Sequence, residues 1–155
     1  MYLLLPRLMY MGEKNPFSVD YIAPGVIAER SFDKTLLIFN IENASSTTLD
    51  SWLNKTKSML VNWPTGIPCL LLYDLHKIGV NNSLYKHFEA LYQSCPHLKR
   101  YTAIVVPATT SIEETQFAFE LQKLHVPPSH PAQWMAFMSR LEAMRWLFAH
   151  DNSFS

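Results

Sequence analysis

The chain has 155 residues, of which 48% are apolar, and thirteen basic side chains balance thirteen acidic ones. This composition suits an ordinary globular core and excludes an intrinsically disordered chain. The longest basic run is the pair Lys99-Arg100, which argues against a surface that tracks nucleic-acid phosphates. No apolar stretch approaches the roughly 20 residues of a membrane span, so we expect a soluble, cytoplasmic protein that binds neither nucleic acid nor membrane.

The chain length suits one domain, which we place at residues 17–150 between tails of residues 1–16 and 151–155. The first eleven residues are apolar but lack a basic region before the apolar run. Pro6 and Arg7 interrupt that run, so it does not match a signal peptide. We expect a tail that the domain does not need in order to fold.

A β-hairpin is predicted near the N-terminus. Residues 26–32 and 35–42 are apolar and rich in β-branched side chains, and only Asp33-Lys34 separates them. So short a connection is typical of antiparallel strands. Apolar residues alternate with polar ones over residues 17–21, which favours a further short edge strand.

Helix–strand units follow the hairpin. Side chains typical of helix N-caps begin four predicted helices, at Thr47, Asn82, Ser111 and Ser139. Three apolar runs predict buried strands, at residues 69–73, 102–106 and 134–138. Right-handed crossovers would make these strands parallel. The predicted fold class is α/β, with an N-terminal β-hairpin followed by βα units, a mixed and mostly parallel sheet of about four to five strands, and four helices.

Helical spacing also predicts which side chains face the core. Trp52 and Trp63 share an apolar stripe, which favours core packing over a ligand cavity. The third helix is expected to bury Phe117, and the last helix to bury Leu141.

Three stretches carry a resemblance to a known family. They are Leu-Leu-Ile-Phe at 36–39, Leu-Leu-Tyr-Asp-Leu at 71–75, and Glu-Ala-Met-Arg-Trp-Leu at 142–147 with Phe137 ahead of it. Together with the element order over residues 26–147, they make the chain resemble a STAS-like (SpoIIAA-like) domain, the fold of anti-sigma-factor antagonists and their uncharacterised bacterial relatives. The resemblance implies a non-catalytic domain that binds a protein partner or a small ligand.

The antagonists present an Asp-Ser-Ser-Gly type loop whose serine a partner kinase phosphorylates. The corresponding loop here is residues 80–84, where Ser83 stands near the phosphorylated position and Asn81 and Asn82 replace the acidic and small residues. Capping of the following helix is the alternative explanation for the Asn-Asn-Ser sequence, and we favour it.

Asp74 ends a predicted central strand, where open α/β sheets place functional groups, and His76 follows two residues later. The alternative for Asp74 is a purely structural carboxylate that accepts hydrogen bonds from its loop. The candidate partner-binding residues are Asp74, His76, Asn81, Asn82 and Ser83.

Motifs for catalysis and for cofactors are absent from the sequence. The six histidines form no metal-ligand spacing, no G-x-S-x-G is present, and the four glycines do not cluster into a phosphate-binding loop. Cys69 and Cys95 are expected to be reduced thiols. We therefore expect no enzyme activity, no metal and no cofactor. The leading interpretation is a regulatory protein-interaction module, and the alternative is a domain that binds a small apolar, lipid-like ligand.

Overall fold

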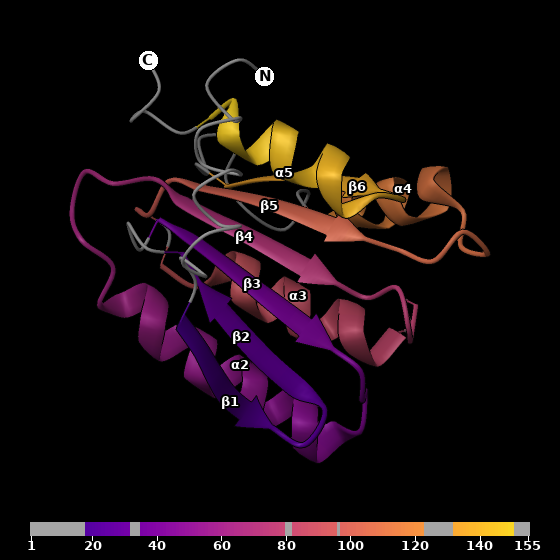
Figure 1. Ribbon diagram of the computed structural model, residues 1–155, viewed down its shortest axis with the longest axis horizontal. Coiled ribbons are helices and arrows are strands. Elements are labelled where there is room, and N and C mark those ends of the chain that lie inside the picture. The colour runs from indigo at the N-terminus through magenta and orange to yellow at the C-terminus, as the bar shows by residue number, and fades with distance from the viewer. Residues whose placement is uncertain (1–17, 32–34, 80–81, 96, 123–131, 151–155) are drawn as a thin grey trace.

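The computed structural model describes residues 18–31, 35–79, 82–95, 97–122 and 132–150. They form one six-stranded sheet in the order β1-β2-β3-β4-β5-β6 (Figure 1). The strands are β1 Ser18–Ala23, β2 Val26–Arg30, β3 Leu36–Ile41, β4 Cys69–Asp74, β5 Arg100–Val105 and β6 Ala132–Phe137. The helices are α2 Ser46–Val61, α3 Asn82–Gln93, α4 Ile112–Gln122 and α5 Arg140–Phe148.

The predicted α/β class is confirmed. Strands β1, β2 and β3 pair antiparallel, and β3 to β6 pair parallel, as expected of a hairpin followed by βα units. The strands number six rather than four to five, because the alternating segment near residue 20 forms a full strand at one edge of the sheet. The predicted hairpin connection, Asp33-Lys34, and both tails lie outside the described residues.

The two faces of the sheet carry separate hydrophobic clusters. Helices α2 and α3 cover one face, while α5 covers the other (Figure 1). On the first face Phe39 stacks on Tyr73 at 5.4 Å between ring centres, and Trp52 meets both rings edge-on. Trp52 is fully buried and Trp63 nearly so, which confirms their predicted place in the core.

Two of the predicted helix starts are seen in full. Ser111 Oγ accepts a hydrogen bond from the Glu114 amide, and Ser139 Oγ accepts one from the Glu142 amide. The start predicted at Thr47 is wrong, because α2 begins at Ser46 and its N-cap is Ser45, whose Oγ accepts from the Thr48 amide at 3.3 Å.

The predictions for Phe117 and Leu141 are also wrong. Phe117 is 64% exposed and Leu141 is 45% exposed. Helix α5 buries Ala143, Met144, Leu147 and Phe148 instead.

Helix α4 lies against the edge strand β6 and contacts its backbone. Gln116 Oε1 accepts a hydrogen bond from the Ala136 amide at 3.0 Å, and Gln116 Nε2 donates to the Trp134 carbonyl at 3.3 Å. The carboxamide thus satisfies one donor and one acceptor on the outer edge of the strand.

A buried arginine caps the C-terminal end of α3. Arg100, only 2% exposed, donates through its two terminal nitrogens to the carbonyls of Leu91, Tyr92 and Ser94 at 2.7 to 2.8 Å. Burial lowers the pKa of this guanidinium, while the carbonyls at the negative end of the helix dipole favour its charge. Among the helices described, none is both long and apolar enough to cross a membrane.

Candidate functional site at the carboxyl edge of the sheet

Strands β3 and β4 carry polar side chains where they approach their carboxyl ends. Asn40 and Asp74 are direct partners in the parallel register, on the face of the sheet that α5 covers. Alternation along each strand places them on this face, in line with Ile38 and Leu72. Carboxyl ends of parallel strands are where α/β folds gather functional groups.

Asp74 is 6% exposed, and both of its carboxylate oxygens are engaged. Oδ1 accepts from the His76 amide at 3.2 Å and lies 2.5 Å from His76 Nδ1. Oδ2 accepts from Nε and Nη2 of Arg140 at 3.2 and 2.9 Å.

Arg140 reaches this carboxylate from the first residue of α5. Its Nη2 also donates to Asn40 Oδ1, and its Nη1 lies 3.5 Å from Glu29 Oε2. One guanidinium therefore joins α5 to β2, β3 and β4. We call Glu29, Asn40, Asp74, His76 and Arg140 the edge cluster.

The electrostatics of the cluster favour an ionised Asp74. Burial by itself raises the pKa of this carboxyl, but the hydrogen bonds from His76 and Arg140 outweigh burial and lower the pKa below its ordinary value. Asp74 therefore carries a negative charge at neutral pH, balanced by Arg140.

The charge on Asp74 determines which ring nitrogen of His76 carries a proton. An ionised carboxylate only accepts hydrogen bonds, so the nitrogen facing it, Nδ1, carries a proton. The His76 side chain is 54% exposed. In the neutral ring Nε2 is then the acceptor, and an incoming donor can approach it from solvent.

The other predicted site residues are not part of this cluster. Asn81 lies outside the described residues, and so does the side chain of Asn82, the first residue of α3. Ser83 is exposed in the first turn, and its carbonyl lies 2.7 Å from His87 Nδ1. Among the described residues, the structure therefore joins only Asp74 and His76 of the five predicted residues.

Sequence reasoning missed Asn40, Glu29 and Arg140. Asn40 did leave a signal, since it is the one polar side chain in the apolar run of β3. Arg140 left none, because its reach across the sheet depends on how α5 packs.

An exposed apolar patch adjoins the edge cluster. Val19, Tyr21 and Ile27 are 57%, 68% and 45% exposed, and we call them the hairpin patch. Tyr21 pairs with Ile27, and Ile27 pairs with Asn40, so these two residues continue the row of the sheet that contains Asn40 and Asp74. Val19 pairs with Glu29 of the edge cluster.

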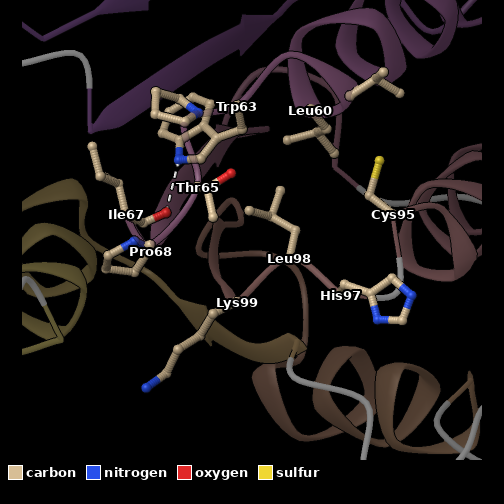
Figure 2. Close-up of a pocket in the computed structure, with 12 residues that line it drawn as sticks. Leu60, Trp63, Thr65, Ile67, Pro68, Cys95, His97, Leu98 and Lys99 are labelled. Carbon is tan, nitrogen blue, oxygen red and sulfur yellow. Dashed lines mark hydrogen bonds between the residues drawn. The ribbon is translucent and has the colours of Figure 1, made fainter.

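A pocket of about 500 Å³ lies at the opposite, amino edge of the parallel strands (Figure 2). It lies between the end of α2 with its following loop, up to Pro68, and the segment from Cys95 to Lys99 that leads into β5. Cys95, half-buried on its wall, and Cys69, fully buried, are both free thiols, as predicted. Burial raises the pKa of Cys69 far above its ordinary value, which makes this thiol unreactive.

Comparisons of the chain with protein-family models, with curated proteins and with solved structures find no match.

Proposed function

We propose that this chain is a non-catalytic, cytoplasmic interaction module of the STAS-like kind. In this proposal a protein partner binds across the hairpin patch and the exposed ring of His76. A hairpin followed by βα units is the element order that the resemblance implies, which supports the proposal.

The observation that carries the proposal is the shared row of the sheet. An exposed aromatic and two exposed aliphatic side chains lie beside a pre-organised polar cluster. Protein interfaces typically combine an apolar, often aromatic centre with a polar rim. Tyr21 and Ile27 would supply the centre, and His76 would supply a rim acceptor that needs no reordering.

The hydrogen bonds of Asp74 leave it without a role as general base or nucleophile of its own. A general base or nucleophile needs a free lone pair directed at substrate, whereas hydrogen bonds from His76 and Arg140 occupy both carboxylate oxygens. We assign Asp74 the role of positioning His76.

Affinity capture from a lysate of the source cells tests the proposal with matched variants. We expect the tagged chain to retain one stoichiometric partner, and Tyr21→Ser and His76→Ala to lose it. Phe117→Ser is the control, because Phe117 is 64% exposed, close to the 68% of Tyr21, but lies on α4.

Each captured partner is then titrated against the purified variants. Equal affinity for the natural chain and for Tyr21→Ser would contradict the proposal, as would loss of binding by Phe117→Ser alone. Circular dichroism of each variant confirms that the fold is retained.

A further inference from the structure

An apolar segment, residues 1–11, precedes the domain, and the hairpin patch lies on the first strand that follows it. Only residues 12–17 separate this segment from Ser18, where β1 begins, and β1 carries Val19 and Tyr21 of the patch. We infer that residues 1–11 fold back over the hairpin patch of the same chain and compete with the protein partner for it. The competition rests on the proposed function, whereas the contact within the chain does not.

The hairpin patch belongs to the part of its sheet face that lacks a helix. Strand pairing places Val19, Glu29 and Ile38 in one row, and Ile38 is a member of the hydrophobic cluster under α5. This cluster takes its buried residues from β3, β4, β5 and α5 and, within the described ranges, none from β1 or β2. Helix α5 packs against β4, β5 and β6, away from β1 and β2 (Figure 1). A segment lying over the patch would bury apolar area that water now contacts.

The segment has the apolar character that this surface requires. Nine of its eleven side chains are apolar, and four of the nine are leucines, at positions 3, 4, 5 and 8. Leucine side chains suit an aromatic and aliphatic patch, because the favourable free energy of such a contact comes mainly from apolar area removed from water. Since segment and patch belong to one chain, their effective concentration is high, and a weak contact is enough to keep the patch covered.

The charges of the segment and of the patch surroundings are complementary. Arg7 is the only charged side chain in residues 1–11. The edge cluster holds two carboxylates, Glu29 and Asp74, against the single guanidinium of Arg140, which leaves one negative charge in excess. The Glu29 side chain is 28% exposed, its Oε2 lies 3.5 Å from Arg140 Nη1, and its Oε1 has no hydrogen-bond partner in the described part of the chain. Arg7 therefore has a carboxylate to bind beside the patch.

The connection to β1 is long enough and contains residues that form turns. Gly12 and the pair Asn15-Pro16 lie within residues 12–17. Six extended residues span up to about 20 Å. Tyr21 lies three positions beyond Ser18, which is about 10 Å along the strand. The chain can therefore reverse its direction before β1 and place residues 1–11 over β1 and β2.

Methyl NMR of the full chain, without any partner, tests the contact. The δ1-methyl resonance of Ile27, assigned with Ile27→Val, reports on the patch. That of Ile67, which is 38% exposed in the loop between α2 and β4, is the reference. The double substitution Leu4→Ser/Leu8→Ser should shift the Ile27 resonance and remove nuclear Overhauser effects between leucine methyl groups and the Tyr21 ring. An unchanged Ile67 resonance shows that the fold is retained.

A charge exchange tests the position of Arg7. Arg7→Glu should shift the Ile27 resonance in the same direction as the leucine substitutions, because repulsion from Glu29 displaces the segment. Adding Glu29→Arg to Arg7→Glu should move the resonance back toward its natural position. Lys14→Glu is the matched control, since it reverses a charge in the connection, and it should leave the resonance where it is.

The partner captured by the natural chain tests the competition. If the segment covers the patch in nine of ten molecules, the apparent affinity for the partner is about tenfold weaker than that of an open patch. Leu4→Ser/Leu8→Ser should therefore bind the purified partner about tenfold more tightly than the natural chain, whereas Lys14→Glu should bind it equally.

The possible failures are distinguishable. An Ile27 resonance that moves with neither the leucine substitutions nor Arg7→Glu would overturn the inference and leave the proposed partner surface intact. A shift of this resonance that grows with protein concentration would place the segment of a second copy on the patch, which also contradicts the inference. A shift independent of concentration, together with unchanged affinity for the partner, would overturn the competition and with it the proposed partner surface.

Discussion

Arg140 binds Asp74 through two hydrogen bonds to one carboxylate oxygen, at 2.9 Å from Nη2 and 3.2 Å from Nε, across 66 positions of sequence. The pair ties the first residue of α5 to the last residue of the central strand β4. Helix α5 packs on this face of the sheet and contributes Ala143, Met144, Leu147 and Phe148 to the second hydrophobic cluster, so the contact ties that helix to the strands beneath it.

Arg140→Ala should destabilise the fold by about 1–3 kcal/mol, because it leaves a largely buried carboxylate without its cation. Urea unfolding followed by circular dichroism measures the change. Arg145→Ala, an exposed arginine on the same helix, is the control and should change stability by less than about 0.5 kcal/mol. Equal effects of the two substitutions would mean that the Asp74 contact contributes nothing.

Asp74→Asn should make the stability of the chain less dependent on acid pH. The folded pKa of Asp74 is lowered, so its contribution is complete above the unfolded pKa of about 3.9 and is lost as pH falls through the folded value. Urea unfolding at several pH values should therefore show that the free energies of unfolding of the natural chain and of the variant converge below about pH 4. A constant difference between them down to pH 2 would contradict the lowered pKa.

Ser45→Ala and Ser139→Ala should each destabilise the chain by about 1 kcal/mol, because each leaves an N-terminal amide of its helix without an acceptor. Ser58→Ala, at an exposed position within α2, should be neutral or slightly stabilising, since alanine has the higher helix propensity. Thermal unfolding of the three variants compares them directly, and a loss of stability at Ser58 matching the other two would show that capping is not the cause.

Ser83→Asp and Ser83→Ala should both bind the captured partner as the natural chain does. Ser83 is exposed, and a carboxylate in the first helical turn is favoured by the helix dipole. Titration of the purified partner against both variants is the measurement. Loss of binding by Ser83→Asp alone would instead indicate a phosphorylation switch at this serine.

The sequence predicted those features of the fold and of the site that depend on residues close together in the chain. Asp74 was found because it ends an apolar run, and Ser139 because its side chain and Glu142 form a capping pattern. Both signals lie within a few residues of the feature that they describe.

Side-chain burial and contacts that depend on how distant helices and strands pack were not predictable. The helical spacing of Phe117 is correct for a buried face, yet α4 lies at the sheet edge and turns Gln116 and Thr115 inward. The contact of Arg140 with Asn40 requires both the β3–β4 register and the placement of α5. Neither the register nor the placement can be derived from a single sequence.

The carboxamide of Gln116 has a consequence for self-association. Because it occupies backbone groups on the outer edge of β6, a second chain cannot pair there without displacing it. In the described part of the sheet β1 pairs only with β2, so its outer edge is open. If two copies join by strand pairing, the open edges meet β1 to β1, which gives a closed twofold dimer, whereas β1-to-β6 pairing would propagate into a fibre.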